Sequence, residues 1–305
     1  ASAVRSQLVW FDRAGTQLAA LGDQGNYGDV ALSPDGSRAA VSLLDPDRAT
    51  RNLWLYDVAR GLSTRFTSDP DEEFAPVWSP DGDRIVYSAR RKGSIDLYQK
   101  ASSGAGREEL LLGDSLGKFQ ASWSGDGRFL VYVAGGGTIG RSDLWVLPTF
   151  GDRKPFPFLD TPIVETQGQF SADGRSIAYA SMDSGRFEVY VAPFPGKGDR
   201  VRVSPAGGGW PRWRRDGREI FYVAPDNTLT AVTVNRQGSA LDIGAARSLF
   251  AARLRPFVRL DAYAYDVSPD GQRFLVNTLV EETTSRAITL VVNWPAALRK
   301  GARNP

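Results

Sequence analysis

A turn sequence that recurs six times at nearly constant spacing is the feature that most constrains this chain of 305 residues. In each copy a large apolar residue is followed, four positions later, by the Gly of an Asp-Gly pair. The successive Asp residues are 46, 45, 47, 43 and 54 positions apart, which indicates a structural repeat of about 45 residues. The six copies are Leu32–Gly36, Trp78–Gly82, Trp123–Gly127, Phe170–Gly174, Trp213–Gly217 and Val267–Gly271.

Each copy has the residues of a hairpin turn between two strands. Pro presets φ at the first turn position, Asp bonds its own backbone, and Gly supplies the left-handed residue. A run rich in β-branched and aromatic residues follows each turn, as is typical of a strand, at 38–43, 84–88, 129–133, 177–180, 220–223 and 274–277. A third strand is predicted in each unit at 52–56, 96–98, 143–146, 188–191, 228–232 and 288–292. A weaker fourth strand is visible at 64–67, 109–112, 154–158 and 201–203.

Six units of four short antiparallel strands predict an all-β fold, a six-bladed β-propeller that forms one domain over residues 1–305. Strands at 8–11 and 17–21 precede the first repeat and have no blade of their own. We therefore expect the N-terminal segment to complete the last blade. One strand is surplus in this count, which leaves a last blade of five strands or a degenerate seventh blade as alternatives. The 54-residue interval predicts an insertion of about nine residues within 235–256.

Composition excludes several classes of site. The chain has no His, which removes Ser-His-Asp catalysis and imidazole metal ligands, and no Cys, which removes disulfides and thiolate sites. The formal charge is +2 and both signs are mixed along the chain, whereas nucleic-acid binders concentrate basic residues in a patch. No run of 18 apolar residues occurs. We expect neither nucleic-acid binding nor membrane insertion by this chain.

The pattern of an aromatic residue, Ser-Pro-Asp-Gly, an apolar strand and then Asp-Leu-Trp/Tyr resembles the WD40-like PD40 repeat of TolB-type propellers. A closer likeness is to the propellers at the C-terminus of certain bacterial serine/threonine protein kinases, which lie beyond a transmembrane helix. The segments that carry it are 8–13, 151–158, 210–217, 270–277 and 291–294. This resemblance implies an extracytoplasmic sensor or scaffold module, with kinase chemistry in another part of a longer protein.

Candidate binding residues lie where the innermost strands are expected to begin, because ring symmetry brings those segments to one rim around the central channel. The segments are 25–29, 72–75, 118–120, 165–167, 209–212 and 261–266. The predicted ligand- or partner-binding residues are Tyr27, Asp29, Phe74, Phe119, Gln120, Gln167, Trp210, Arg212 and Tyr263. An aromatic rim with Arg is typical of a hot spot for a protein or peptide partner. The alternative is that most of these aromatic side chains only pack between blades.

We expect a non-enzymatic module that recognises a protein, peptide or small ligand, with no cofactor and no metal, because each Asp-Gly turn offers one carboxylate and calcium needs several converging oxygens. One alternative is a calcium-dependent propeller hydrolase or lactonase, which would need three or more acidic or amide side chains on the axis. Another is the propeller lid of a serine oligopeptidase whose hydrolase domain is missing; the chain contains no Gly-x-Ser-x-Gly elbow.

Overall fold

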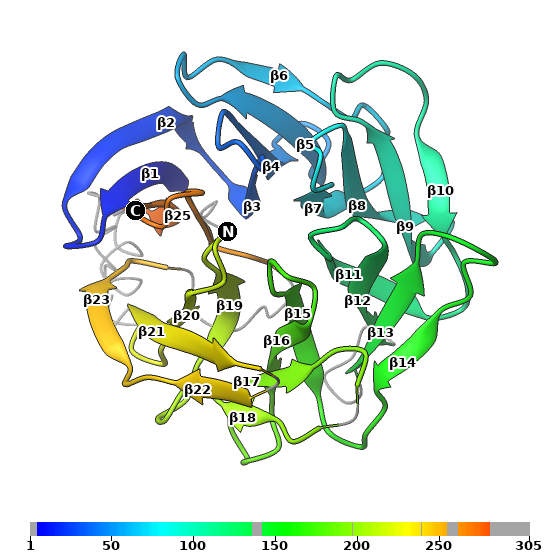
Figure 1. Ribbon diagram of the computed structural model, residues 1–305. Helices are drawn as coiled ribbons and strands as arrows, with labels where there is room; N and C mark the ends of the chain where they lie inside the picture. The colour runs from blue at the N-terminus through cyan, green and yellow to red at the C-terminus, as the bar shows by residue number, and fades with distance from the viewer. Residues whose placement is uncertain (1–4, 136–141, 197, 239, 255–261, 281–305) are drawn as a thin grey trace, which may run out of the picture.

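The computed structural model describes residues 5–135, 142–196, 198–238, 240–254 and 262–280. In these residues it contains 25 strands and no helix, arranged as six sheets in a closed ring (Figure 1). The prediction of an all-β, six-bladed propeller of antiparallel blades is therefore confirmed. No helix in the described part of the chain is long and apolar enough to cross a membrane.

The blades follow the sequence repeat. Blade 1 consists of β3 (Tyr27–Leu32), β4 (Arg38–Asp45), β5 (Thr50–Asp57) and β6 (Ser63–Arg65). Blade 2 consists of β7 (Glu73–Trp78), β8 (Arg84–Arg91), β9 (Ser94–Ala101) and β10 (Glu109–Leu112). Blade 3 consists of β11 (Gly117–Trp123), β12 (Phe129–Gly135), β13 (Ser142–Pro148) and β14 (Phe156–Leu159). Blade 4 consists of β15 (Glu165–Phe170), β16 (Ser176–Ser181), β17 (Glu188–Pro193) and β18 (Val201–Arg202).

The remaining two blades differ from this scheme. Blade 5 is a five-stranded sheet of β19 (Gly209–Trp213), β20 (Glu219–Val223), β21 (Thr228–Gln237), β22 (Ala240–Ile243) and β23 (Arg247–Ala251). Its fifth strand accounts for the insertion predicted within 235–256. Blade 6 consists of β24 (Tyr265–Val267) and β25 (Arg273–Leu279) together with the N-terminal strands β1 (Ser6–Asp12) and β2 (Gln17–Gly25).

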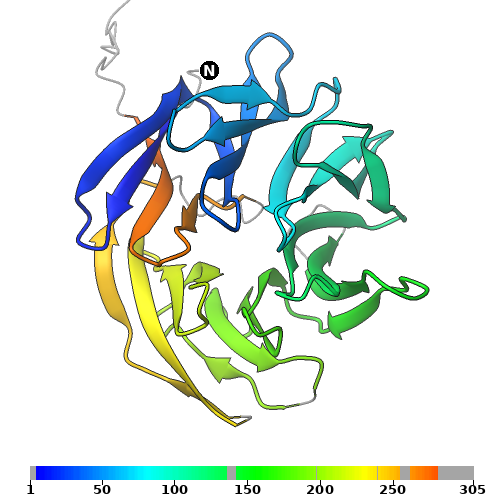
Figure 2. The ribbon, with the colours of Figure 1, turned by 45° about the horizontal axis from the view of Figure 1, so that its top comes forward.

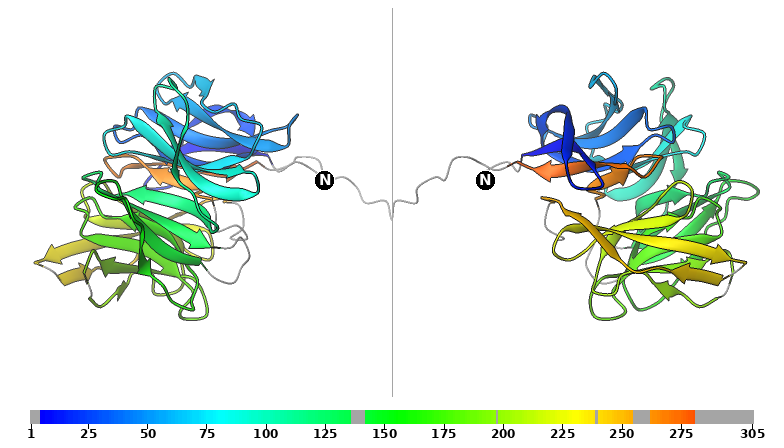
Figure 3. Two further views of the ribbon diagram at one scale, coloured as in Figure 1. Left: turned by 90° about the vertical axis from the view of Figure 1, so that its right-hand side faces the viewer. Right: turned by 60° about the vertical axis from the view of Figure 1, so that its left-hand side comes forward.

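The ring closes as the surplus N-terminal strands predict. β1 pairs antiparallel with β25 from Ser6↔Leu279 to Asp12↔Arg273, and β2 forms the outer edge. The first and last described strands therefore lie side by side, blue beside orange in Figure 3. The strand predicted at 288–292 lies outside the described residues. Within the described residues, β1 and β2 supply the third and fourth strands of blade 6. Blade 6 is therefore complete, and these residues form no seventh blade.

The recurring turns are held by one hydrogen-bond pattern. In blade 1 the Ser33 hydroxyl donates to Asp35 at 2.6 Å and accepts the Arg38 N–H at 2.9 Å. Gly36 has φ +73°, the left-handed conformation that the turn requires. The same Ser-to-Asp bond recurs at four further turns, at Ser79, Ser124, Ser171 and Ser268. The repeated Asp residues thus cap their own hairpins.

The large apolar residue of each repeat packs between neighbouring blades. Trp78 of blade 2 is 5% exposed, and its indole N–H donates to the Ala31 carbonyl of blade 1 at 3.1 Å. Trp213 of blade 5 donates in the same way to the Gln169 carbonyl of blade 4. These bonds fix the spacing between blades while the indole ring fills the apolar space, which is the use expected of a buried Trp.

Candidate functional site

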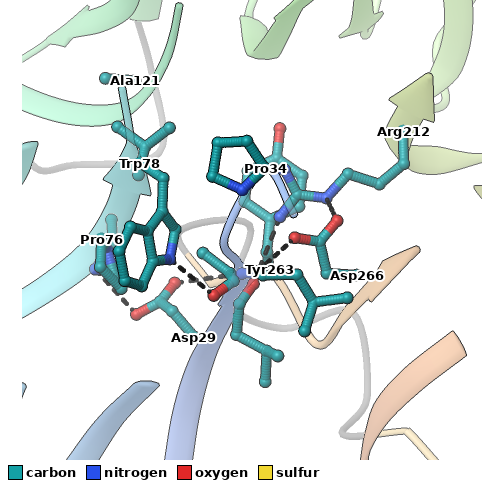
Figure 4. Close-up of a pocket in the computed structure, with 13 residues that line it drawn as sticks. Asp29, Pro34, Pro76, Trp78, Ala121, Arg212, Tyr263 and Asp266 are labelled. Carbon is teal, nitrogen blue, oxygen red and sulfur yellow. Dashed lines mark hydrogen bonds and ion pairs between the residues drawn. The ribbon is translucent and has the colours of Figure 1, made fainter. Parts of the chain in front are cut away.

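A small cavity of about 110 Å³ lies on the propeller axis, because its lining comes from the innermost strands of five blades. Its apolar wall includes Trp78, Pro76 and Ala121, and its polar side carries Arg212 and Asp266 (Figure 4). The two sides face each other across the cavity in the close-up. Ligand sites are typically apolar with a few placed polar groups, and this volume is suited to one side chain rather than to a large ligand.

Arg212 is the centre of the polar side. Its Nε lies 3.3 Å from Asp266 Oδ1, and its Nη1 donates to Gln169 Oε1 at 3.1 Å. The guanidinium carbon lies 3.7 Å from the centroid of the Tyr263 ring, a cation–π contact. Nη2 is 3.4 Å from the Val30 carbonyl. One side chain of blade 5 therefore contacts blades 4, 6 and 1 across the channel.

Asp266 and Gln169 hold this cluster in place. Asp266 Oδ2 accepts the N–H of Leu32 at 2.7 Å, and Oδ1 accepts the N–H of Val267 at 2.9 Å. The Gln169 amide nitrogen donates to the Tyr263 hydroxyl at 2.9 Å. The pKa of Tyr263 is raised by burial, so its hydroxyl stays protonated near neutral pH. The cluster therefore presents a charged but internally compensated face to the cavity.

Asp29 also lines the cavity, but its carboxylate is occupied by the fold. Oδ2 accepts the Ser42 hydroxyl and the Ala75 N–H, both at 2.9 Å, and Oδ1 accepts the Tyr263 N–H at 3.1 Å. Asp29 is 3% exposed and joins blades 1, 2 and 6. It therefore holds the channel wall in place and has little freedom to bind a ligand.

The other predicted rim residues do not form one collar. Gln167 is fully buried and accepts the N–H of Trp210, itself 2% exposed. Tyr27 packs in the apolar cluster between blades 6 and 1, with its hydroxyl 3.0 Å from that of Tyr56. Phe74 and Phe119 contact each other at 6.2 Å between ring centroids, away from the cavity. The side chain of Gln120 lies outside the described residues. The inter-blade alternative thus fits Tyr27, Gln167 and Trp210, whereas Asp29, Arg212 and Tyr263 meet at the cavity.

The prediction of binding residues missed Trp78 and Asp266, which line the cavity, and Gln169, which accepts a hydrogen bond from Arg212. A signal for two of them exists in the repeat. The residue just before the large apolar position is Gln169, Arg212 and Asp266 in three consecutive blades, whereas it is Ala31 and Val77 in blades 1 and 2. Aligning the repeats at this position predicts a channel that is polar on one side and apolar on the other.

The described residues contain no group of three or more acidic side chains that could hold a metal ion. At the axis, Asp29 and Asp266 each accept backbone N–H groups, and Arg212 places a positive charge beside them. This donor set does not fit the calcium site that the hydrolase alternative requires.

Comparison with known families and proteins agrees with this architecture. The profile of the PD40 family, described as a TolB beta propeller domain, matches residues 7–146. The structure of a putative TolB from Agrobacterium tumefaciens superposes with a TM-score of 0.68 at 17% identity, covering 91% of this chain and 99% of that one. An oligogalacturonate lyase in complex with manganese shares the fold, with a TM-score of 0.56 at 13% identity over 92% and 99% of the two chains.

Two curated relatives are named peptidases. An uncharacterized peptidase, YuxL, of Bacillus subtilis is 26% identical over 204 residues, which are 64% of this chain but 29% of the relative. Dipeptidyl-peptidase 5 of Porphyromonas gingivalis is 34% identical over 73 residues, 23% of this chain and 11% of the relative. The chain thus spans less than a third of either relative. These names correct the expectation that this chain is non-enzymatic, which rested on missing catalytic motifs, because the named relatives point to an enzymatic function.

The repeat chemistry, the ring of six sheets and the structural likeness agree: this chain folds as a six-bladed β-propeller like that of TolB, and its residues 7–146 match the PD40 family.

Proposed function

We propose that this chain is the peptide-binding propeller of a peptidase, in which the axial cavity receives one side chain of a peptide substrate. The observation that carries the proposal is the two-sided cavity at the channel, with Trp78 and Ala121 on one side and the Arg212–Asp266 pair on the other. The names of the two relatives support the enzymatic context.

The geometry is suited to a peptide for two reasons. The apolar wall can bury a small aliphatic or Pro side chain, which favours binding by the hydrophobic effect. The Arg212 guanidinium has five N–H donors, and the hydrogen bonds described at this side chain use only two of its terminal donors. The remaining donors can reach a peptide carbonyl or carboxylate beside the buried side chain.

The experiment uses acetylated pentapeptide amides, Gly-Gly-X-Gly-Gly, that differ only in the central residue. The readout is the indole N–H resonance of Trp78 in heteronuclear NMR spectra, assigned with Trp78→Phe. We expect peptides with Val, Leu or Pro at X to shift this resonance and the all-Gly parent to leave it unchanged. Arg212→Met should weaken binding about tenfold, the effect of losing one charge-assisted hydrogen bond.

Two further variants make the result decisive. Ala121→Leu fills the apolar side without touching Arg212 and should abolish the shift. Arg107→Met removes an exposed Arg on blade 2, and this variant should bind the peptides as tightly as the unsubstituted protein does. Equal binding by the parent, the Ala121 variant and the Arg212 variant would contradict the proposed site.

A second candidate is an extracytoplasmic sensor propeller of a bacterial receptor kinase that binds a protein, peptide or small ligand. The sequence likeness of 151–158 and 210–217 to such propellers favours it, as does the likeness to TolB structures. The gene distinguishes the two: a kinase and a membrane helix encoded upstream support the sensor, and a hydrolase domain encoded in the same chain supports the peptidase.

A further inference from the structure

Blade 5 departs from the repeat in three ways that meet at one place. Its turn has Arg214-Arg215 where other copies have Ser followed by Pro, Gly or Ala. β21 has ten residues, the longest strand of the propeller as described, and its distal half pairs with β22 from Val234↔Ile243 to Gln237↔Ala240. The resulting hairpin projects beyond the ring at the yellow end of Figure 2. In a repeat protein, a local break in the pattern is where function is expected.

The hairpin forms one wall of a groove of about 540 Å³ between blades 4 and 5. The other wall is the turn of blade 4, Ser171–Asp173, and Asp216–Arg218 of the blade 5 turn completes the groove. Leu241 and Ile243 of the hairpin pack on the apolar core between the two blades. The wall is therefore anchored, and the groove is a preformed feature whose volume lies in the range of ligand sites.

Charge in and around the groove is unbalanced once the ion pairs are taken into account. Asp173 Oδ2 lies 3.2 Å from Arg236 Nε, and Asp216 Oδ2 lies 3.4 Å from Arg214 Nε. Among the described residues, neither Arg215 nor Arg218 has an ion pair or a side-chain hydrogen bond, and both are exposed. The acidic groups are thus neutralised, and two guanidinium groups remain for an external anion.

The remaining lining suits an extended polypeptide. Asn235 is exposed on the hairpin wall, and its amide can both donate to and accept from a peptide group. Trp213 is the one aromatic residue of the lining, and its indole N–H is already bonded to blade 4.

We propose that the groove between blade 4 and the β21–β22 hairpin binds an acidic, extended segment of a partner polypeptide. Arg215 and Arg218 pair with its carboxylates, and Asn235 bonds its main chain. This surface is separate from the axial cavity, because none of its lining residues is shared with that cavity.

The test measures fluorescence anisotropy with fluorescein-labelled hexaglutamate, using labelled hexalysine as the opposite charge. We expect hexaglutamate to bind and hexalysine not to bind, with affinity falling as salt screens the exposed charges. The double variant Arg215→Ser, Arg218→Ser should lose at least tenfold in affinity. The matched control, Arg107→Ser with Arg84→Ser, removes two exposed Arg residues of blade 2 and should bind within twofold of the parent.

A second variant tests the hairpin. Replacing residues 235–242 by Asn-Gly joins the paired residues Val234 and Ile243 through a two-residue turn and should also reduce affinity. Thermal unfolding checks that both variants keep the fold. Equal affinity in the groove variants and the control, or no binding of hexaglutamate to the parent, would overturn the proposal. Tighter binding of an acidic oligosaccharide of equal charge would overturn the ligand class.

Discussion

Two buried glutamates differ in how completely their carboxylates are hydrogen-bonded. Glu188 is well paired: Oε2 accepts the Gly207 N–H at 2.9 Å and also the Ser204 hydroxyl, and Oε1 accepts Arg186 at 2.8 Å. Glu165, the first residue of β15, accepts only Thr161 at Oε1, and Oε2 has no hydrogen-bond partner among the described residues. Burial raises the pKa of Glu165 to about 6.

At the residue scale we predict a pH-dependent stabilisation by Glu165→Gln. Because the pKa is higher in the folded state, ionisation of Glu165 costs nothing below pH 4.5 and opposes folding as the pH rises through about 6. Urea unfolding should therefore show little difference at pH 4.5 and a gain of about 1 kcal/mol at pH 8. The paired control, Glu188→Gln, should lose about 1–2 kcal/mol at pH 8. Destabilisation by both variants at pH 8 would show that Glu165 is paired in solution.

At the scale of the strand, the first five blades share a device that positions the channel wall. Their innermost strands contain a register shift, as between Phe74 and Val77 in β7. The shifted residue has positive φ at Ala75 (+51°), Gln167 (+60°) and Trp210 (+53°). At two of these residues the N–H donates to a side chain of the preceding blade: Ala75 donates to Asp29 of blade 1, and Trp210 donates to Gln167 of blade 4. These bulges explain why the first residues of the strands hold blades together.

We predict that Gln167→Ala destabilises the protein by about 1–3 kcal/mol, because the buried N–H of Trp210 loses its acceptor. Chemical denaturation measures the change, and hydrogen exchange at the Trp210 amide should accelerate. Gln24→Ala on the exposed edge strand β2 is the control, with a change within about 0.5 kcal/mol. A loss below that of the control would mean that Gln167 does not act as a clamp.

At the scale of the whole molecule, closure joins parts of the chain that are far apart in sequence. Besides the β1–β25 ladder, Arg13 at the end of β1 reaches blade 5, where its two terminal nitrogens lie 3.0 and 2.7 Å from the Glu219 carboxylate. Arg13 also donates to the Gly271 carbonyl, and Arg214 contacts Glu219 at 3.2 Å. The bidentate pair therefore ties the N-terminal strands to both blades at the closure.

We predict that Arg13→Met destabilises the propeller by about 3 kcal/mol, because Glu219 is left largely buried with one partner. The exposed pair between Arg60 and Asp57, 3.9 Å apart, is the control, and Arg60→Met should change the unfolding free energy by at most about 0.5 kcal/mol. Equilibrium unfolding in urea measures both. Equal effects of the two substitutions would show that the Arg13 pair contributes nothing to closure.

The sequence was informative where chemistry is local. In five of the six turns Ser bonds Asp, and in all six the Gly adopts the left-handed conformation, so the turns, their spacing and the strands beside them could be predicted from neighbouring residues. The unpaired strands at 8–11 and 17–21 predicted closure because a propeller needs a complete last blade. The insertion in blade 5 followed from one long interval in the repeat.

The amino-acid sequence by itself determined the propeller, because short-range turn chemistry repeated at fixed spacing admits few other arrangements. Only the tertiary structure decided which rim residues face the channel. A bulge changes the alternation of side chains along each inner strand, so residue type alone did not separate Gln167, which clamps blades, from Gln169, which holds Arg212. The contacts that settle this join residues such as Asp29 and Tyr263, which are 234 positions apart, and depend on the ring being closed.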